Sequence, residues 1–166
     1  MIITWYKIKD LIDSENRNIP EDPGIYFVRR ARNGYPVPIP RLGGQDNKGI
    51  LYIGESKNIR RRIGQLINAI VNDGKKNTIY KTKIFCSISK LIKLEEYEIT
   101  WEKLKTHEEA KGQEWAALKL YCDKYHEAPP LNLSLSRELF AIVGIARVGR
   151  SRVAYEADGF VKSIIL

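Results

Sequence analysis

The sequence has 166 residues, of which 43% are hydrophobic, and this size and composition fit one globular domain built on a single core. Lys and Arg number 28 against 20 Asp and Glu, so the formal net charge is +8 and a polyanion such as nucleic acid is a natural partner, although a merely soluble basic protein has the same balance. No stretch of about eighteen apolar residues and no signal-peptide core occurs, which predicts a soluble, intracellular (cytoplasmic) protein with no membrane contact. Cys86 and Cys122 stand alone and indicate neither a zinc site nor a disulfide framework.

The first half of the chain predicts a helix and then two strands. The apolar spacing of residues 6–18 is typical of a short N-terminal helix. Residues 24–30, GIYFVRR, and residues 50–54, ILYIG, alternate like strands, and antiparallel pairing would place Tyr26 and Tyr52 on one shared face. The same alternation places Ile25, Phe27, Leu51 and Ile53 on the opposite face.

The segment between these strands, residues 31–49, is rich in Gly and Pro, so no regular element is expected to run through its length. Its residues Arg32, Tyr35 and Arg41 are candidates to reach a groove of DNA. A loop that packs on the protein itself is an alternative of equal weight.

The second half predicts two well-defined helices and a third strand between them. Ser56 is expected to cap a helix whose apolar residues recur at helical spacing over residues 59–71. Residues 97–104 alternate like a half-buried strand. A capping box then opens a helix over residues 106–125, while residues 72–94 indicate a further helix only weakly.

This order of elements predicts an α+β fold in which a small central mixed or antiparallel three-stranded sheet is flanked by helices. No composition shift or repeat marks a second domain, so residues 1–166 are interpreted as a single domain. Residues 134–166 are interpreted as a C-terminal extension that is rich in β-formers and ends in a hairpin.

Three consecutive arginines open the first of these helices. Arg61 lies almost opposite the apolar stripe on a helical wheel and should be solvated, whereas Arg60 and Arg62 lie on the two edges of the stripe. An arginine at such an edge either extends its stem over the core into solvent or aims its guanidinium along the strand ends, where its fork suits a phosphate.

Glu114 is centred on the apolar face of its helix, among Ala110, Ala117, Leu118 and Tyr121. A carboxylate in such a place needs a cation, and the pattern leaves a metal ion and an arginine equally open. The two histidines, His107 and His126, have no third partner at a useful spacing and are expected at the surface.

Four motifs in one order resemble those of the GIY-YIG nuclease family. GIY stands at residues 24–26, YIG at residues 52–54, an arginine ten residues after the second tyrosine, and a glutamate before PPLN at residues 129–132. The resemblance covers about residues 22–133 and implies the GIY-YIG nuclease fold and divalent-metal-dependent hydrolysis of DNA phosphodiester bonds. Restriction-type, sequence-specific cleavage is favoured, while nucleases of repair, recombination and mobile elements share the same residues.

Carried over by position, the resemblance implies that Tyr26 acts as general base, that Tyr52 positions the attacking water and that Arg62 holds the phosphate. Arg62 and the metal are expected to help Tyr26 lose its proton. Glu114 would be the sole protein ligand of one Mg²⁺ or Mn²⁺. A palindromic target would imply a homodimer. The side chains expected to contact DNA are Lys57, Arg60, Arg61, Arg32, Arg41 and Asn132.

The sequence departs from the family pattern at three points. The link between the two tyrosines is long, Leu66 stands where many members have a histidine, and Glu55 stands where some have a lysine. Glu55 would either oppose DNA or offer a second metal contact. These departures keep open a nucleic-acid-binding module without cleavage, whereas an interaction domain with no nucleic-acid partner would leave the basic segment unexplained.

Overall fold

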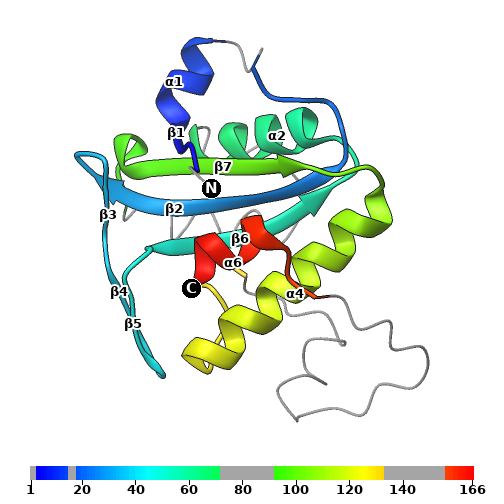
Figure 1. The fold of residues 1–166 in the computed structure, drawn as a ribbon. Coiled ribbons are helices and arrows are strands. Elements are labelled where there is room, and N and C mark those ends of the chain that lie inside the picture. Colours follow the sequence, from blue (N-terminus) through cyan, green and yellow to red (C-terminus); the bar gives the residue numbers. More distant parts are fainter. Residues whose placement is uncertain (1–2, 15–17, 72–91, 133–155) are drawn as a thin grey trace.

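The computed structural model describes residues 3–14, 18–71, 92–132 and 156–166, and these form an antiparallel sheet with helices on both faces (Figure 1). The expected α+β architecture is thereby confirmed. None of the described helices is both long and apolar enough to cross a membrane. The strands are β1 (Tyr6–Lys7), β2 (Gly24–Arg32), β3 (Tyr35–Pro36), β4 (Ile39–Arg41), β5 (Gly44–Asp46), β6 (Ile50–Ser56) and β7 (Tyr97–Lys103), and the helices are α1 (Ile8–Asp13), α2 (Ile59–Val71), the 3-10 turn η1 (Leu94–Glu96), α4 (His107–Tyr125) and α6 (Gly159–Ile165).

The sheet is organised around β2, which pairs with β7 on one side and with β6 and β3 on the other. The strand β1 extends the sheet beyond β7, so β7 is an interior strand. The expectation of a half-buried β7 is wrong, because Glu98 and Thr100, on its polar face, are buried as well. Glu98 is stabilised there by Arg29, whose Nη2 lies 2.6 Å from its carboxylate.

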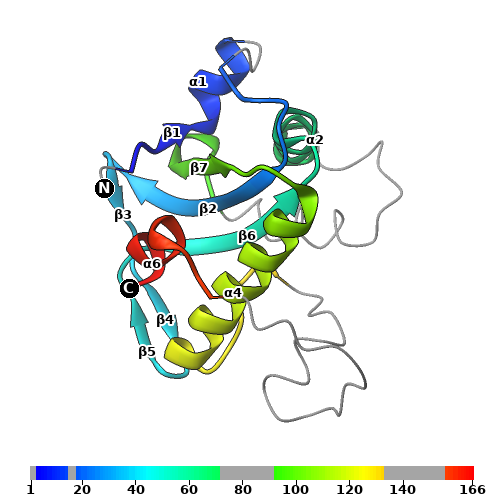
Figure 2. The ribbon, with the colours of Figure 1, turned by 45° about the vertical axis from the view of Figure 1, so that its right-hand side comes forward.

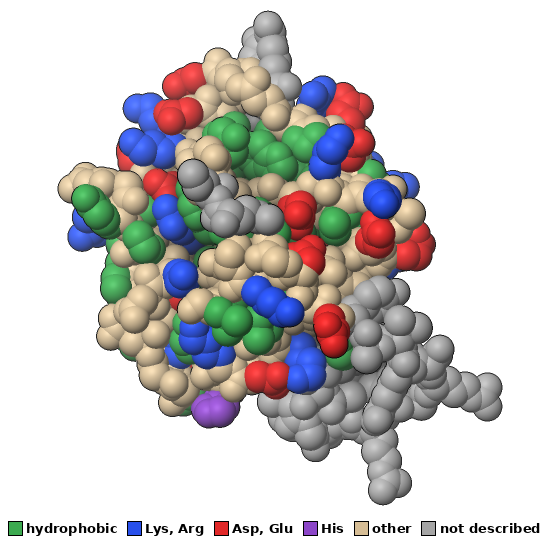
Figure 3. All heavy atoms as spheres, in the orientation of Figure 1, with side chains coloured by type: hydrophobic (Ala, Val, Ile, Leu, Met, Phe, Trp, Pro, Cys, Tyr) green, Lys and Arg blue, Asp and Glu red, His purple; other side chains and the backbone are tan. Residues whose placement is uncertain are grey.

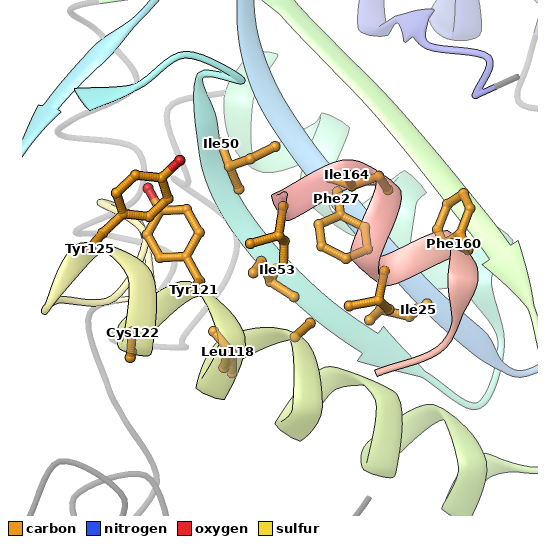
Figure 4. Packing of buried hydrophobic residues seen from close by; sticks show 13 residues of the cluster. Ile25, Phe27, Ile50, Ile53, Leu118, Tyr121, Cys122, Tyr125, Phe160 and Ile164 are labelled. Atoms are coloured by element: carbon orange, nitrogen blue, oxygen red, sulfur yellow. The ribbon is translucent and has the colours of Figure 1, made fainter. Parts of the chain in front are cut away.

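Each face of the sheet carries its own core. The helices α4 and α6 cover one face, where Phe27 and Ile53 pack with the buried side of α4 (Figure 4). The helices α1 and α2 cover the other, where Tyr26 and Val28 pack against Ile63 of α2. The two ribbon views agree on this arrangement, with the sheet between the two helix pairs (Figures 1 and 2).

The insertion between β2 and β6 is largely a packed structure. It forms the short strands β3, β4 and β5, and the β4–β5 pair lies against the C-terminal end of α4. Asp46 is fully buried and accepts hydrogen bonds from the backbone N–H of Ile50 and from the Tyr121 hydroxyl, each at 2.8–2.9 Å. The Gly43 N–H donates to the Tyr125 carbonyl at 2.9 Å. These contacts tie the insertion to α4.

Two sequence predictions about β6 and α2 are wrong in detail. A register shift opposite Val28 and Arg29 leaves Leu51 as an extra residue, so Leu51 lies on the same side as Tyr52 and not with Ile53. The cap of α2 is Asn58 and not Ser56, because the Asn58 Oδ1 accepts from the N–H of Arg61 at 2.8 Å.

The ends of the chain differ from expectation in their secondary structure. The N-terminal helix is present but shorter, over Ile8–Asp13, after the two-residue strand β1. In the C-terminal extension, Gly159–Ile165 form a helix and not a strand, because Asp158 caps it and its apolar residues enter the core beside Phe27. The rest of the expected hairpin and the weakly predicted helix over residues 72–94 lie almost entirely outside the described residues.

Candidate active site

Two tyrosines meet on the α2 side of the sheet. Tyr26 of β2 pairs directly with Gly54 of β6, and Tyr52 lies two residues before Gly54. The tyrosine ring centroids are 5.8 Å apart. A Cβ at Gly54 would lie 2.6 Å from both the Tyr26 Oη and the Tyr52 Cε1, closer than real Cβ atoms approach such neighbours. Gly54 is therefore required for the two rings to pack over the strand.

Arg62 reaches this pair from the first turns of α2. Its Nε donates to the Tyr26 Oη at 3.1 Å. The proximity of Tyr26 raises the pKa of the half-buried guanidinium, although burial acts in the opposite direction, so Arg62 is a permanent cation. Of the two orientations that the helical wheel left open, Arg62 adopts the one that points toward the strands.

Burial dominates the ionisation of Tyr26. The side chain is completely inaccessible to solvent, and this raises the pKa of its hydroxyl well above the ordinary value, with a further contribution from Tyr52. Arg62 acts to lower the Tyr26 pKa but does not offset the burial. The expected help from Arg62 is thus present but insufficient, and Tyr26 is a neutral phenol at neutral pH.

Glu114 lies on α4, which runs antiparallel to β6 along the opposite face of the sheet (Figure 2). Two contacts fix this alignment: His107, at the start of α4, meets Glu55 at the end of β6, and Tyr121 meets Asp46 just before β6. Glu114 is seven residues from each of these helical anchors. It therefore lies between these two anchors, alongside the first half of β6, and its side chain is partly buried.

The donor set limits which metal this site can hold. Among the described residues, no group of three or more His, Cys, Asp or Glu side chains is arranged to hold a metal ion. Mg²⁺ keeps several waters and often takes only one or two carboxylates together with phosphate oxygens of the substrate. A single carboxylate such as Glu114 fits that requirement.

One contact near this site was missed at the level of sequence. The His107 Nε2 lies 2.6 Å from the Glu55 Oε2, and both side chains are largely buried. His107 had been expected to be a surface residue with no partner. The two residues are 52 positions apart, so no local pattern could have indicated their contact.

Asn132 acts on the same strand. Its side-chain amide binds the backbone of Ile53 twice, accepting from the N–H at 3.0 Å and donating to the carbonyl at 2.8 Å. The N–H of Leu131 also donates to the Leu51 carbonyl at 2.9 Å. The residues after PP in PPLN thus bind the edge of β6 that faces away from β2, as another strand would.

The basic residues expected on DNA are placed unequally. Lys57 and Arg61 are exposed. Arg60 binds the Ile19 carbonyl and Glu21, Arg32 binds Glu96, and Arg41 binds Glu127 with only 8% of its side chain exposed. On the face that Figure 3 shows, lysines and arginines are interspersed with acidic side chains and do not form one continuous basic patch.

No protein-family model matches the chain, and no curated protein matches it. A solved structure does: the GIY-YIG N-terminal endonuclease domain of UvrC from Thermotoga maritima, a point mutant bound to its catalytic divalent cation. The match covers 75% of this chain and 98% of that chain at 18% identity, with a TM-score of 0.38. The chain is similar to that domain with this identity and this TM-score.

Proposed function

We propose that this protein is a divalent-metal-dependent endonuclease that hydrolyses DNA phosphodiester bonds. The observation that carries the proposal is the convergence of Tyr26, Tyr52 and Arg62 at one point of the sheet. Phosphodiester hydrolysis needs a cation at the phosphate, a group that accepts a proton from water and stabilisation of the leaving oxygen. Arg62 meets the first requirement, and Tyr26 meets the second once its hydroxyl is ionised.

In this proposal, each residue has one task. Arg62 binds a non-bridging oxygen of the phosphate, which its fixed charge and fork geometry allow. Tyr52, which is partly exposed, orients the water, and Tyr26 accepts its proton once its own has been lost. Because the pKa of Tyr26 is raised, that ionisation limits the rate at neutral pH.

Glu114 is the residue that would hold Mg²⁺ or Mn²⁺. When bound, the ion supplies charge stabilisation to the leaving oxygen. Glu114 contributes one carboxylate ligand from a helix whose ends are both tied to the sheet or its insertion, so the position of this ligand is held rigidly.

Restriction-type cleavage is the finer proposal, and its support comes from the tip of the β2–β3 hairpin. Tyr35 is 77% exposed there, and the Arg32 side chain is 62% exposed beside it. Arg41 would have to leave Glu127 and the Ala128 carbonyl before it could contact DNA. Lys57 and Arg61, which are exposed, are assigned to the DNA backbone.

The test is cleavage of supercoiled plasmid in Mg²⁺, with EDTA as the negative control. Tyr26→Phe, which keeps the ring, and Arg62→Ala should each lower the single-turnover rate by at least about 100-fold. Lys119→Gln, on the exposed side of α4, serves as the matched control and should cleave like the parent. Discrete fragments would support sequence specificity, and a smear would count against it.

A nucleic-acid-binding module gives a different result in the same assay. Such a protein would bind the plasmid but leave it intact in every metal, and the Tyr26 and Arg62 variants would behave like the parent. That outcome would refute the proposed function.

A further inference from the structure

Glu55 and His107 form a hydrogen-bonded contact that none of the roles proposed above uses. The His107 Nε2 and the Glu55 Oε2 are 2.6 Å apart, with side-chain exposures of 30% and 22%. Glu55 belongs to the end of β6 and His107 is the first residue of α4, so the contact joins the two elements that carry Tyr52 and Glu114.

On the strand side, the contact adjoins the packing point of the tyrosines. Glu55 directly follows Gly54, against which Tyr26 and Tyr52 both pack. A shift of the Glu55 backbone would move Gly54 with it, because successive strand residues are linked by rigid peptide units. The position of this strand end therefore determines where both tyrosine hydroxyls lie.

On the helix side, the contact is transmitted to Glu114. Seven residues separate His107 from Glu114, which is about two turns of helix, so the two side chains leave α4 on nearly the same side. The start of α4 is held by a complete capping box, in which the Glu109 N–H donates to the Thr106 Oγ1 at 3.1 Å. The first turn is therefore held against fraying, and it moves together with the rest of the helix.

We propose that the Glu55–His107 pair is a positioning device that sets where the Glu114 carboxylate stands relative to the tyrosine hydroxyls. The other end of α4 is anchored independently, by the Tyr121 hydroxyl on Asp46 at 2.9 Å. Loss of the pair would free only the N-terminal half of the helix, which carries Glu114 seven residues before the remaining anchor. This inference rests on the proposed function, since it assigns Glu114 to the metal.

The proposal accounts for a departure from the family pattern. A carboxylate at position 55 had two expected roles, as an obstacle to DNA or as a second metal contact. In the structure its Oε2 is instead bound by His107. We assign Glu55 to helix placement, with no direct contact to metal or phosphate.

The experiment is a double-mutant cycle with Glu55→Ala, His107→Ala and the double variant. Free Mn²⁺ is measured by electron paramagnetic resonance with protein alone, so metal affinity is read without DNA or cleavage. Each single variant should weaken Mn²⁺ binding by about tenfold, and the double variant should be no weaker than either, because each change breaks the same contact. Plasmid affinity should stay unchanged.

Two controls separate positioning from loss of folding. Asp123→Ala breaks the Lys119–Asp123 pair on the exposed side of the same helix and should leave Mn²⁺ affinity intact. Glu55→Gln, which keeps an oxygen able to accept from His107, should recover most of the affinity lost in Glu55→Ala. A purely structural role would lower the melting temperature without changing the Mn²⁺ affinity of the folded fraction.

Failure of the inference and failure of the proposed function are distinguishable. A parent protein that cleaves plasmid, together with variants that keep the Mn²⁺ affinity of the parent or that lose it additively, refutes the positioning role alone. A parent that neither cleaves DNA nor binds Mn²⁺ refutes the proposed function and the inference with it.

Discussion

Replacement of Gly54 by alanine tests the geometry of the tyrosine pair. The added Cβ would lie 2.6 Å from the Tyr26 Oη and the Tyr52 Cε1, whereas ordinary van der Waals contact begins at 3.4 Å, so each ring has to move by about 0.8 Å. Tyr26 has no free space, since it is fully buried and hydrogen-bonded by Arg62. Misplacement on this scale costs about 100-fold in rate, and overpacking costs about 1–3 kcal/mol of the free energy of unfolding.

Gly64→Ala is the matched control, because apart from its chain neighbours and the backbone of its own helix no atom of the described residues lies within 4 Å of the position that its Cβ would take. Gly64 lies inside α2, where alanine should raise the free energy of unfolding by about 0.5–1 kcal/mol. Single-turnover plasmid cleavage gives the rate, and urea unfolding gives the stability. If Gly54→Ala cleaves within about twofold of the parent while Gly64→Ala does the same, the packed tyrosine pair is not the reacting centre.

Three further predictions use the same two assays. Because burial raises the pKa of Tyr26, the logarithm of the single-turnover rate should rise with pH, with a slope of about one and no plateau below pH 9. A plateau near pH 7 would exclude Tyr26 as the base. Burial and the neighbouring Asp158 raise the pKa of Glu102 to about 7, above its value in the unfolded chain, so the stability of the parent should fall as the pH rises from about 4.5 to 7. Glu102→Gln should therefore be more stable than the parent by about 1–2 kcal/mol at pH 8 but not at pH 4.5. Equal stabilities of the two proteins at pH 8 would contradict the shift. Asn132→Ala removes both amide contacts to β6 and should cost about 1–3 kcal/mol together with activity, whereas a loss of DNA affinity at unchanged stability would indicate a direct DNA contact.

Local patterns were sufficient where a contact depends on neighbouring residues. Strand alternation indicated that Tyr26 and Tyr52 share a face, and helical periodicity placed Arg62 at the edge of the apolar stripe of α2. The structure brings these three side chains together. Their positions follow from periods of two and of 3.6 residues, which the sequence displays directly.

Contacts between distant segments were not accessible in this way. The Glu55–His107 pair and the binding of Arg41 by Glu127 each join elements far apart in the sequence. The bulge at Leu51 depends on the pairing register of two strands, and no single strand encodes it. Such features arise from the tertiary fold, so local sequence patterns do not predict them.

The C-terminal helix shows a different limit. Its residues GFVKSII are rich in β-formers, which favoured a strand, yet Asp158 accepts from the Val161 N–H at 2.8 Å and starts a helix. Phe160 and Ile164 then fill the α4 side of the core (Figure 4). Burial against the sheet outweighs the intrinsic preference, which differs between residues by less than about 1 kcal/mol.

Glu114 is the residue for which the sequence left two explanations, and stability separates them. A carboxylate kept for an ion pair with an arginine contributes to folding, so Glu114→Gln would lower the free energy of unfolding by about 3 kcal/mol if the pair is buried and by less if it is exposed. A carboxylate whose role is to bind a metal does not stabilise the metal-free protein. Its neutralisation should therefore leave the free energy of unfolding unchanged or raise it, while abolishing cleavage.

We expect the second outcome, because Glu114 is only partly buried, whereas Glu96 and Glu98, which pair with arginines of β2, are buried. The measurement is urea unfolding of Glu114→Gln in EDTA, with Glu98→Gln as a comparison. Glu98 is held by Arg29, so its neutralisation should destabilise the protein. A loss of stability in Glu114→Gln as large as that in Glu98→Gln would assign Glu114 to the scaffold and remove the metal ligand from the proposed site.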